Sequence, residues 1–375
     1  MLAVDSGLEL SLVKVMKKVI FATAICAVSG YASAQSSVTL FGQIDEAIAY
    51  INNAGGASSV RLRSGAWIGS QWGLAGTEDL GGGYRTFFRL ENGFDINTGK
   101  FAQNGRAFGR QSYVGIGTPY GNLSFGRQYD EVVDYVGPIM ANGRGTAPIY
   151  DIDNTGNDWQ TSNSVKYVSP TMAGFSVSAL YAFGGVPGQF STDSVASVGA
   201  GYTHGPLQIG AAYTSVHNPY ATWFDSTGAS NIAVFGQFLP TAHALNIAAG
   251  GMAYKFGKLI GRVGISHSNL TDSVDGADAQ YTIYMAQADY WARPTLRLAA
   301  AVDLIYGNIG SIDEHPHYRQ YNLVADYFLS KRTDAYMWAI YGTAGNGAQT
   351  MQIGMLPASS TNRQFNINFG LRHRF

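Results

Sequence analysis

The dominant pattern along the chain is an alternation of apolar and polar residues with a period of two. At the C-terminus, residues 365–375 (FNINFGLRHRF) place mostly apolar side chains at odd positions and Asn, Gly or Arg at even positions. Residues 296–304 and 38–45 alternate in a similar way. Because successive side chains of a strand point to opposite faces, this pattern predicts β-strands with one apolar and one polar face.

Soluble β-sandwiches also alternate, so a second criterion is needed for the fold class. The predicted strands are long, about 10–14 residues against an average of about 5–6 in globular proteins. Many polar-face positions carry charges, which a packed core would exclude. We predict short turns at 79–83, 118–122, 169–171, 204–206, 256–258, 293–294 and 330–332, and long loops near 52–60, 130–160, 184–193, 218–242, 270–278, 308–317 and 344–362. Short turns on one side and long loops on the other are typical of outer-membrane barrels.

Seventeen segments qualify as strands, and one of them covers residues 231–238. Bacterial single-chain barrels have an even number of strands, and Leu239-Pro240 follows this segment, so we assign it to a long loop. The prediction is an all-β fold, a 16-stranded antiparallel transmembrane β-barrel formed by residues 35–375. A barrel of about 16–18 strands leaves an aqueous channel instead of a filled core.

The N-terminal region has the features of a secretory signal peptide. A basic pair at 17–18 precedes an apolar run at 19–28 and an A-x-A site that ends at Ala34. We predict that residues 1–34 are the signal-peptide region, with the true start at Met16 and cleavage after Ala34. The apolar run is too short for a membrane-spanning helix, which needs about 20 residues.

Composition narrows the choice of function. The chain has 24 Lys and Arg against 25 Asp and Glu, and its 13 % of charged residues is low beside the roughly 25 % of soluble domains. The absence of a basic excess argues against nucleic-acid binding, and low charge suits an outer surface that faces lipid. The only cysteine, Cys26, lies in the signal region, which removes cysteine redox chemistry from the mature chain. We find no nucleotide or zinc motif, the glycines at 81–83 being a turn, and predict no cofactor and no metal.

Six motifs in order resemble a known family. They are residues 37–45 (SVTLFGQID), 76–83 (GTEDLGGG), 90–94 (LENGF), 126–130 (GRQYD), 163–170 (NSVKYVSP) and 370–375 (GLRHRF). Together they are similar to Gram-negative general, non-specific outer-membrane porins of the beta-proteobacterial and neisserial type. The resemblance extends over essentially all of the mature chain.

This resemblance implies a homotrimer of sixteen-stranded barrels in the cell outer membrane, in contact with outer-membrane lipid and lipopolysaccharide. It implies that the third long loop folds into the pore. It also implies that the terminal Phe375 is the signal read by the barrel-insertion machinery. The expected function is passive diffusion of ions and small hydrophilic solutes through a water-filled channel, with no enzymatic activity.

The alternation also predicts which charges face the channel. The pore set that we predict comprises the wall residues Arg63, Arg85, Arg89, Arg110 and Lys166 and the loop residues Asp130, Glu131, Asp134, Asp151 and Asp153. Outward positions assigned to Leu62, Ala66 and Ile68 leave Arg61 and Arg63 facing inward. An acidic loop opposite a basic wall would create a transverse field that filters solutes and biases ion flow. The alternative is that these charges only keep the channel wet.

Two positions depart from the pattern of similar porins. Gln71 and Gln160 stand where an arginine is common, and Arg89 adds a base that many relatives lack. The resemblance alone would imply a strong anion filter, whereas these departures lead us to predict weak or moderate selectivity.

Arg127 and Glu46 share their faces with apolar neighbours and are therefore predicted to face outward. A basic side chain on the lipid face costs about 2–4 kcal/mol at the bilayer centre, and an acidic one less. We predict that both lie at a subunit interface with polar partners. The alternative is a position at the level of the lipid headgroups.

The sequence is also compatible with two other functions. A substrate-specific channel would use the same barrel, with its specificity in loop geometry that the sequence does not give. A barrel enzyme is less favoured, because none of the seven histidines stands in a triad or metal spacing with a second supporting feature.

Overall fold

The computed structural model describes residues 37–141, 151–227, 232–274, 276–310 and 314–375. The predicted signal region, with Met16 and the cleavage site at Ala34, lies outside these residues. The strands are β1 (Ser37–Ala54), β2 (Ala57–Ser64), β3 (Gln71–Gly81), β4 (Tyr84–Gly93), β5 (Gln111–Thr118), β6 (Gly121–Gln128), β7 (Thr161–Val168), β8 (Phe175–Ala182), β9 (Val195–His204), β10 (Leu207–His217), β11 (Ala244–Phe256), β12 (Leu259–Val274), β13 (Ala277–Arg293), β14 (Leu296–Ile309), β15 (His317–Phe328), β16 (Thr333–Gly345) and β17 (Arg363–Arg374). The short helical segments are α2 (Ala102–Gly105), η1 (Val132–Val136), α3 (Gly137–Met140), α4 (Pro219–Thr222) and η4 (Gly236–Thr241).

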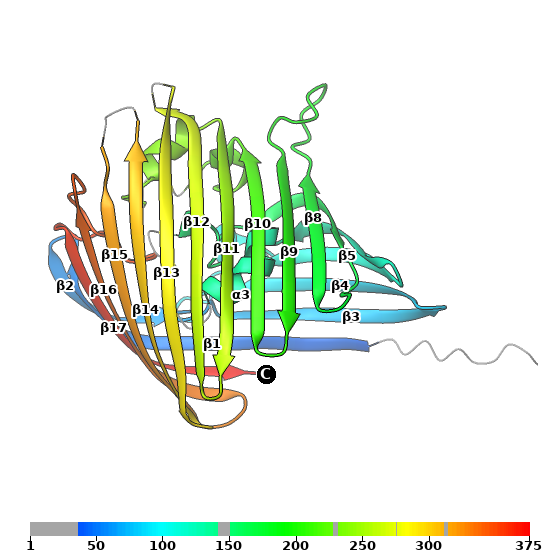
Figure 1. The fold of residues 1–375 in the computed structure, drawn as a ribbon, viewed down its shortest axis with the longest axis horizontal. Helices are drawn as coiled ribbons and strands as arrows, with labels where there is room; N and C mark the ends of the chain where they lie inside the picture. The colour runs from blue at the N-terminus through cyan, green and yellow to red at the C-terminus, as the bar shows by residue number, and fades with distance from the viewer. Residues whose placement is uncertain (1–36, 142–150, 228–231, 275, 311–313) are drawn as a thin grey trace, which may run out of the picture.

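These strands form one antiparallel sheet that closes into a barrel (Figure 1). The ring closes where β1 pairs with β17, and the C-terminus lies beside β1 in Figure 1. On its other edge β1 pairs with both β2 and β3, so these two short strands share one position in the wall. The predicted 16-stranded antiparallel barrel is therefore confirmed, with one wall strand in two pieces.

The barrel has apolar residues outside and polar residues inside. Large apolar side chains such as Val60 (71 % exposed) and Leu323 (58 % exposed) lie on the outer face. Asp303 and Asn368 are fully buried on the inner face. This is the reverse of a soluble protein, and it is the arrangement expected when lipid surrounds the wall and water fills the interior.

Exposed aromatic residues gather near the short turns. They include Tyr84, Tyr120, Phe175, Phe256 and Tyr327, each within or close to a turn between neighbouring strands. Aromatic side chains prefer the boundary between lipid and water, where the ring is in a partly apolar medium. Their position marks the level of one membrane surface.

Several predicted loops differ from the structure. The connections expected near 52–60 and 270–278 are tight hairpins, because β1 and β2 join through Gly55 and Gly56, and Val274 of β12 pairs with Ala277 of β13. Gly55 and Gly56 have positive φ values of 72° and 114°, which let the chain reverse within two residues. Conversely, residues 94–110 form a long connection that the pattern did not predict. The segment proposed as a loop at 231–238 contains no strand in its described part, as predicted.

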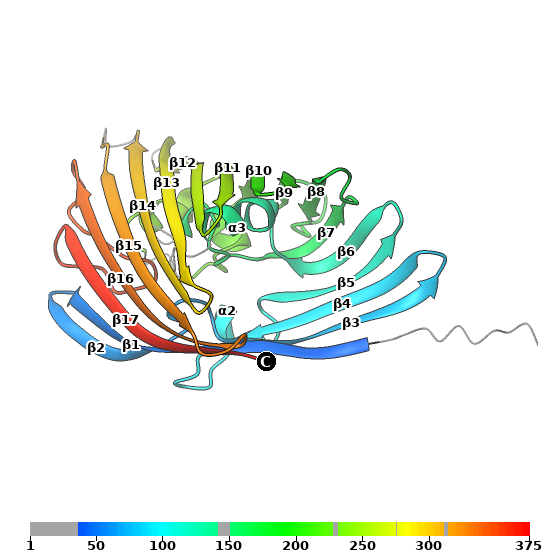
Figure 2. The ribbon, with the colours of Figure 1, turned by 60° about the horizontal axis from the view of Figure 1, so that its bottom comes forward.

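The longest connection joins β6 to β7 and begins with η1 and α3. The segment η1 contacts β9, β10 and β11, and α3 contacts β10, β11 and β12. Figure 2 shows α3 within the curve of the wall. Glycines on the inner face of the wall make this close approach possible. A Cβ atom on Gly210 would lie only 2.0 Å from the carbonyl oxygen of Tyr135, and one on Gly264 would lie 2.5 Å from Met140.

This contact gives a testable prediction. The substitution Gly210→Ala should push η1 away from the wall and destabilise the fold by about 1–3 kcal/mol through overpacking. Gly250→Ala is the matched control, because the nearest atom to its added Cβ would be 3.6 Å away. Denaturant unfolding of the refolded barrel should show a loss for the first variant only, and equal stability of the two would contradict this packing.

Candidate channel lining

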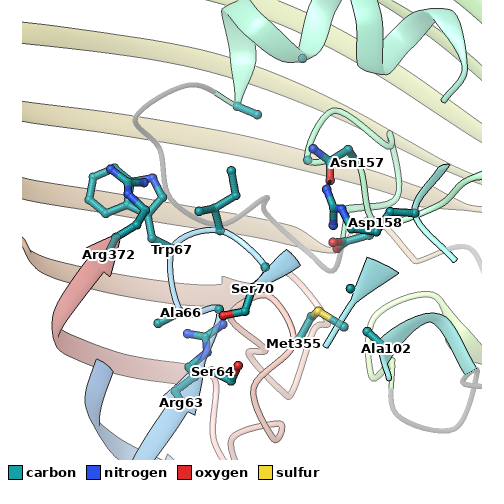
Figure 3. A pocket seen from close by; sticks show the side chains of 18 of the residues that line it. Arg63, Ser64, Ala66, Trp67, Ser70, Ala102, Asn157, Asp158, Met355 and Arg372 are labelled. Carbon is teal, nitrogen blue, oxygen red and sulfur yellow. Dashed lines mark hydrogen bonds between the residues drawn. The ribbon is translucent and has the colours of Figure 1, made fainter. Parts of the chain in front are cut away.

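A cavity of about 820 Å³ occupies the interior of the barrel. One side is formed by Arg63 of β2, Arg372 of β17 and Trp67 (Figure 3). Trp67 lies in the segment that connects β2 and β3. Asn157 and Asp158, which precede β7, lie across from them in Figure 3. The cavity is therefore bounded both by the wall and by the long connection between β6 and β7.

Positive charge exceeds negative charge in the cavity lining. The charged residues that line it are Arg63, Arg110, Arg297, Arg372 and Arg374 and the acids Asp95, Asp158 and Asp326. Five bases against three acids give a formal net charge of +2 for the lining.

Two of the predicted bases, Arg89 of β4 and Arg110 just before β5, form a charged cluster with Glu91 of β4. Glu91, which is 1 % exposed, lies between the guanidinium groups of Arg89 and Arg110. The Nε of Arg110 donates to Glu91 over 2.8 Å, and its Nη2 donates to the hydroxyl of Tyr129 over 2.8 Å. One carboxylate thus compensates two bases.

Lys166 joins the wall to the start of the long connection. Its Nζ donates to the carbonyl oxygen of Tyr129 over 2.9 Å and lies 3.3 Å from the carboxylate of Glu131. It also forms a close ion pair with Asp134. Glu131 accepts a further hydrogen bond from Ser178 on β8. The structure therefore brings together three of the predicted residues at the foot of η1.

Three other predicted acids are fully buried, and each accepts hydrogen bonds from other groups of the protein. Asp130 accepts from Thr214 and Asn154, and burial raises its pKa to about 7. Asp151 accepts from the backbone N–H groups of Gly156 and Asp158, and burial raises its pKa well above the usual value. Asp153 accepts from Thr155 and Ser266.

The raised pKa of Asp130 has a consequence for stability. A carboxyl group whose pKa is raised on folding favours the folded state most at pH values below its unfolded pKa, near 4. That contribution falls as the pH rises toward about 7.

Arg63 and Arg85 lie at different levels of the barrel. The guanidinium carbon of Arg63 is 5.9 Å from the ring centroid of Trp338, beside the cavity. Arg85 lies near the short-turn end of β4, where it donates to Asn122 over 3.0 Å. Arg85 is thus separated from the cavity that Arg63 and Arg110 line.

The two glutamines singled out in the sequence lie away from the cavity lining. The backbone carbonyl of Gln160 accepts from Arg127 over 3.2 Å, and its side-chain oxygen accepts from the same residue over 3.3 Å. Gln71 pairs with Gln43 of β1 and with Gly93 of β4.

Arg127 and Glu46 find their observed partners in the same chain. Arg127 donates to the carbonyl of Gly109 over 2.6 Å and to the hydroxyl of Ser162 over 2.7 Å. Glu46 accepts from Asn97 over 3.3 Å, and its Oε2 is buried without a hydrogen-bond partner among the described residues. Phe375 pairs through its backbone with Gly42 of β1 and so completes the closure of the ring.

The sequence prediction missed a ladder of charges on the inner face from β12 to β17. It runs through Arg262, Asp289, Arg297, Asp326, Arg372, Asp334 and Arg374, with successive ion-pair distances from 2.8 to 3.7 Å. The signal was present in the alternation, since Arg297 and Arg372 occupy polar-face positions of strands that were identified. The predicted pore set, by contrast, contains no residue after Lys166.

Within the described ranges, no helix is long and apolar enough to cross a membrane. The same ranges hold no cluster of three or more His, Cys, Asp or Glu side chains suited to a metal ion.

Comparisons with known proteins identify related sequences and folds. Residues 22–347 match the profile of a family described as Gram-negative porin. An outer membrane porin protein of Bordetella pertussis is 35 % identical over 54 % of this chain and 60 % of its own length, so the match spans less than two thirds of that relative. The major outer membrane protein P.IB of Neisseria gonorrhoeae is 26 % identical over 89 % of this chain and 95 % of its own.

Among solved structures, an anion-selective porin from Comamonas acidovorans has a TM-score of 0.71 and 24 % identity. It covers 91 % of this chain and 100 % of its own.

Proposed function

The chain belongs to the Gram-negative porin family of the outer membrane, and we propose that it forms a water-filled channel for passive diffusion of ions and small hydrophilic solutes. The main support for this proposal is that the barrel has apolar side chains on its outer face and polar side chains on its inner face. A wall with Val60 and Leu323 outside and Asp303 and Asn368 inside has a lipid-facing surface and a hydrated interior.

Liposome swelling tests this function against a substrate-specific channel. Vesicles that contain the purified chain should swell in neutral sugars at rates that depend on solute size alone. Saturation by one solute would favour the specific channel instead. The named relatives are outer membrane proteins and porins, and we propose that this chain, too, is a channel and not an enzyme.

The proposal includes a transverse field across the channel. Arg63 and Arg372 lie on one side of the cavity, and Asp158 lies on the other (Figure 3). Arg297 lines the cavity too, and it contacts the same Trp67 ring as Arg372. We propose that the connection between β6 and β7 narrows the channel, because η1 and α3 contact the wall from β9 to β12.

The lining supports a weak or moderate preference for anions. Its formal charge is +2, and the structural relative from Comamonas acidovorans is named an anion-selective porin. Most of the arginines in this lining are paired with carboxylates, which reduces the field that a passing ion meets.

This selectivity should depend on pH. Burial raises the pKa of Asp158 to about 6, against the opposing effect of Arg110 and Arg63. Between pH 8 and pH 5 Asp158 therefore loses its negative charge, and the preference for anions should increase. Reversal potentials in a salt gradient at the two pH values measure this shift. The variant Asp158→Asn should show at pH 8 the stronger anion preference that the unmodified chain shows at pH 5. Its reversal potential should therefore shift less between the two pH values. An unchanged shift would exclude Asp158 as the titrating group.

Three further roles are part of the same proposal. We propose that the protein is a homotrimer that contacts lipopolysaccharide, with Arg127 and Glu46 at the subunit interface. The outward position of both groups and the unpartnered Oε2 of Glu46 support this placement. Phe375, at the end of the strand that closes the ring, is proposed as the signal for the barrel-insertion machinery.

A further inference from the structure

The wall strand opposite β1 contains an insertion that folds into the barrel. Ser64 of β2 pairs with Glu46, and Gln71 of β3 pairs with Gln43. Residues 65–70, here called the wall insert, therefore stand opposite only Ile44 and Asp45. Six residues cannot fit beside two within a flat sheet, so the insert leaves the wall, and all six of its residues line the cavity.

Asp45 holds the insert in place. One carboxylate oxygen accepts from the backbone N–H groups of Trp67 and Ile68 over 2.9 and 2.7 Å, and the other accepts from the hydroxyl of Tyr336 over 2.6 Å. The carbonyl of Asp45 accepts from the N–H of Gly65, and its N–H donates to the hydroxyl of Ser70. Asp45 is fully buried, so both ends and the centre of the insert are fixed to one residue.

The turn of the insert also depends on glycine. Gly65 has a φ of 63°, and a Cβ atom there would lie 2.8 Å from the Cα of Gly69. The sequence prediction placed Ala66 and Ile68 outward, which is wrong, because both lie in the inserted turn and line the cavity. Ala66 is only 2 % exposed. The insert adds four residues to the two that a regular strand would place opposite Ile44 and Asp45. Four is an even number, so the alternation of faces is kept, and Arg63 and Gln71 lie on the same face of the wall.

Trp67 projects from the insert onto the charge ladder. The guanidinium carbons of Arg297 and Arg372 each lie 5.2 Å from its ring centroid. The ring meets Tyr336 edge-on at 5.1 Å and lies 6.2 Å from Trp338. Both arginines line the cavity, yet their side chains are only 12 % and 6 % exposed. The indole therefore covers bases that would otherwise face the channel.

We propose that the wall insert is a specificity element of the channel. Trp67 narrows the cavity on the side opposite Asp158 and shields Arg297 and Arg372 from passing ions. Asp45 is the positioning residue that holds Trp67 there. This inference rests on the proposed channel function.

The test is planar-bilayer recording of the full chain and the variant Trp67→Ala. Loss of the indole should raise the single-channel conductance about 1.5-fold and shift the reversal potential further toward anions, because the passage widens and two bases become accessible. Trp72→Ala is the matched control. Trp72 lies on β3 beyond the insert, packs against Phe108 and does not line the cavity, so its conductance should equal that of the unmodified chain.

The variant Asp45→Ala tests the positioning role. Alanine has no acceptor for the N–H groups of Trp67 and Ile68 or for the hydroxyl of Tyr336, so the insert should loosen. We expect higher open-channel current noise and a shift in reversal potential of the same sign as for Trp67→Ala. A barrel that fails to fold with this change leaves Trp67→Ala as the deciding variant.

The outcomes separate the two proposals. Absence of any conductance in the unmodified chain would overturn the channel function itself. Normal conductance in the unmodified chain, with unchanged conductance and reversal potential in Trp67→Ala, would overturn only the role of the insert.

Discussion

Replacement of Glu91 by alanine is expected to lower the free energy of unfolding by about 3–5 kcal/mol, the cost of breaking a buried ion pair from one side. Glu91 is 1 % exposed and is the carboxylate between Arg89 and Arg110. Its loss leaves Arg110, whose side chain is 9 % exposed, without its ion-pair partner in a region largely removed from water. Denaturant titration of the refolded barrel in detergent measures the change.

Glu78→Ala is the control for this experiment. Glu78 lies in the exposed end of β3, so its removal should change stability by less than about 0.5 kcal/mol. The Glu91 variant, if it folds, should also show a stronger preference for anions, since one negative charge next to the lining base Arg110 is gone. Equal stability of the two variants would mean that Arg89 and Arg110 are solvated independently of Glu91.

Replacement of Lys166 by methionine is expected to cost a similar amount, about 3–5 kcal/mol. Lys166 is 6 % exposed and is the base beside the fully buried Glu131. Without it, Glu131 and Asp134 repel each other at the start of η1, and the connection between β6 and β7 loses an anchor to β7. We therefore also expect larger single-channel conductance with more current noise.

Lys100→Met is the matched control, because Lys100 is an exposed lysine in the connection after β4. It should leave both stability and conductance unchanged. If Lys166→Met lost stability but kept an unaltered conductance, the anchoring role of Lys166 for the channel would be wrong, although its role in the fold would stand.

The barrel wall was predictable from the sequence because each strand shows its two faces in its own alternation of residues. Each strand needs apolar residues every second position for lipid and polar residues between them for the interior. That rule placed the C-terminal strand correctly, with Phe369 and Leu371 outside and Asn368 and Arg372 inside. It also identified the loop at 231–238, because an extra strand would have broken the even count.

The connections and the site were less predictable because they depend on tertiary contacts. Nothing in the local pattern of residues 65–70 shows that Asp45, twenty residues earlier, holds them inside the barrel. Acidic residues in the long connection suggest a charged surface, yet Asp130 and Asp153 are fully buried against Thr214 and Ser266. Tight hairpins such as Gly55-Gly56 were obscured by the polar residues around them.

The most direct test of the channel is single-channel recording of the purified full chain in planar bilayers under a potassium chloride gradient. We expect discrete current steps that occur in groups of three, conductance that increases with salt concentration, and a weak to moderate preference for chloride, because bases outnumber acids in the cavity lining. Insertion without ion current would contradict the channel, and a strong preference for potassium would contradict the assigned lining.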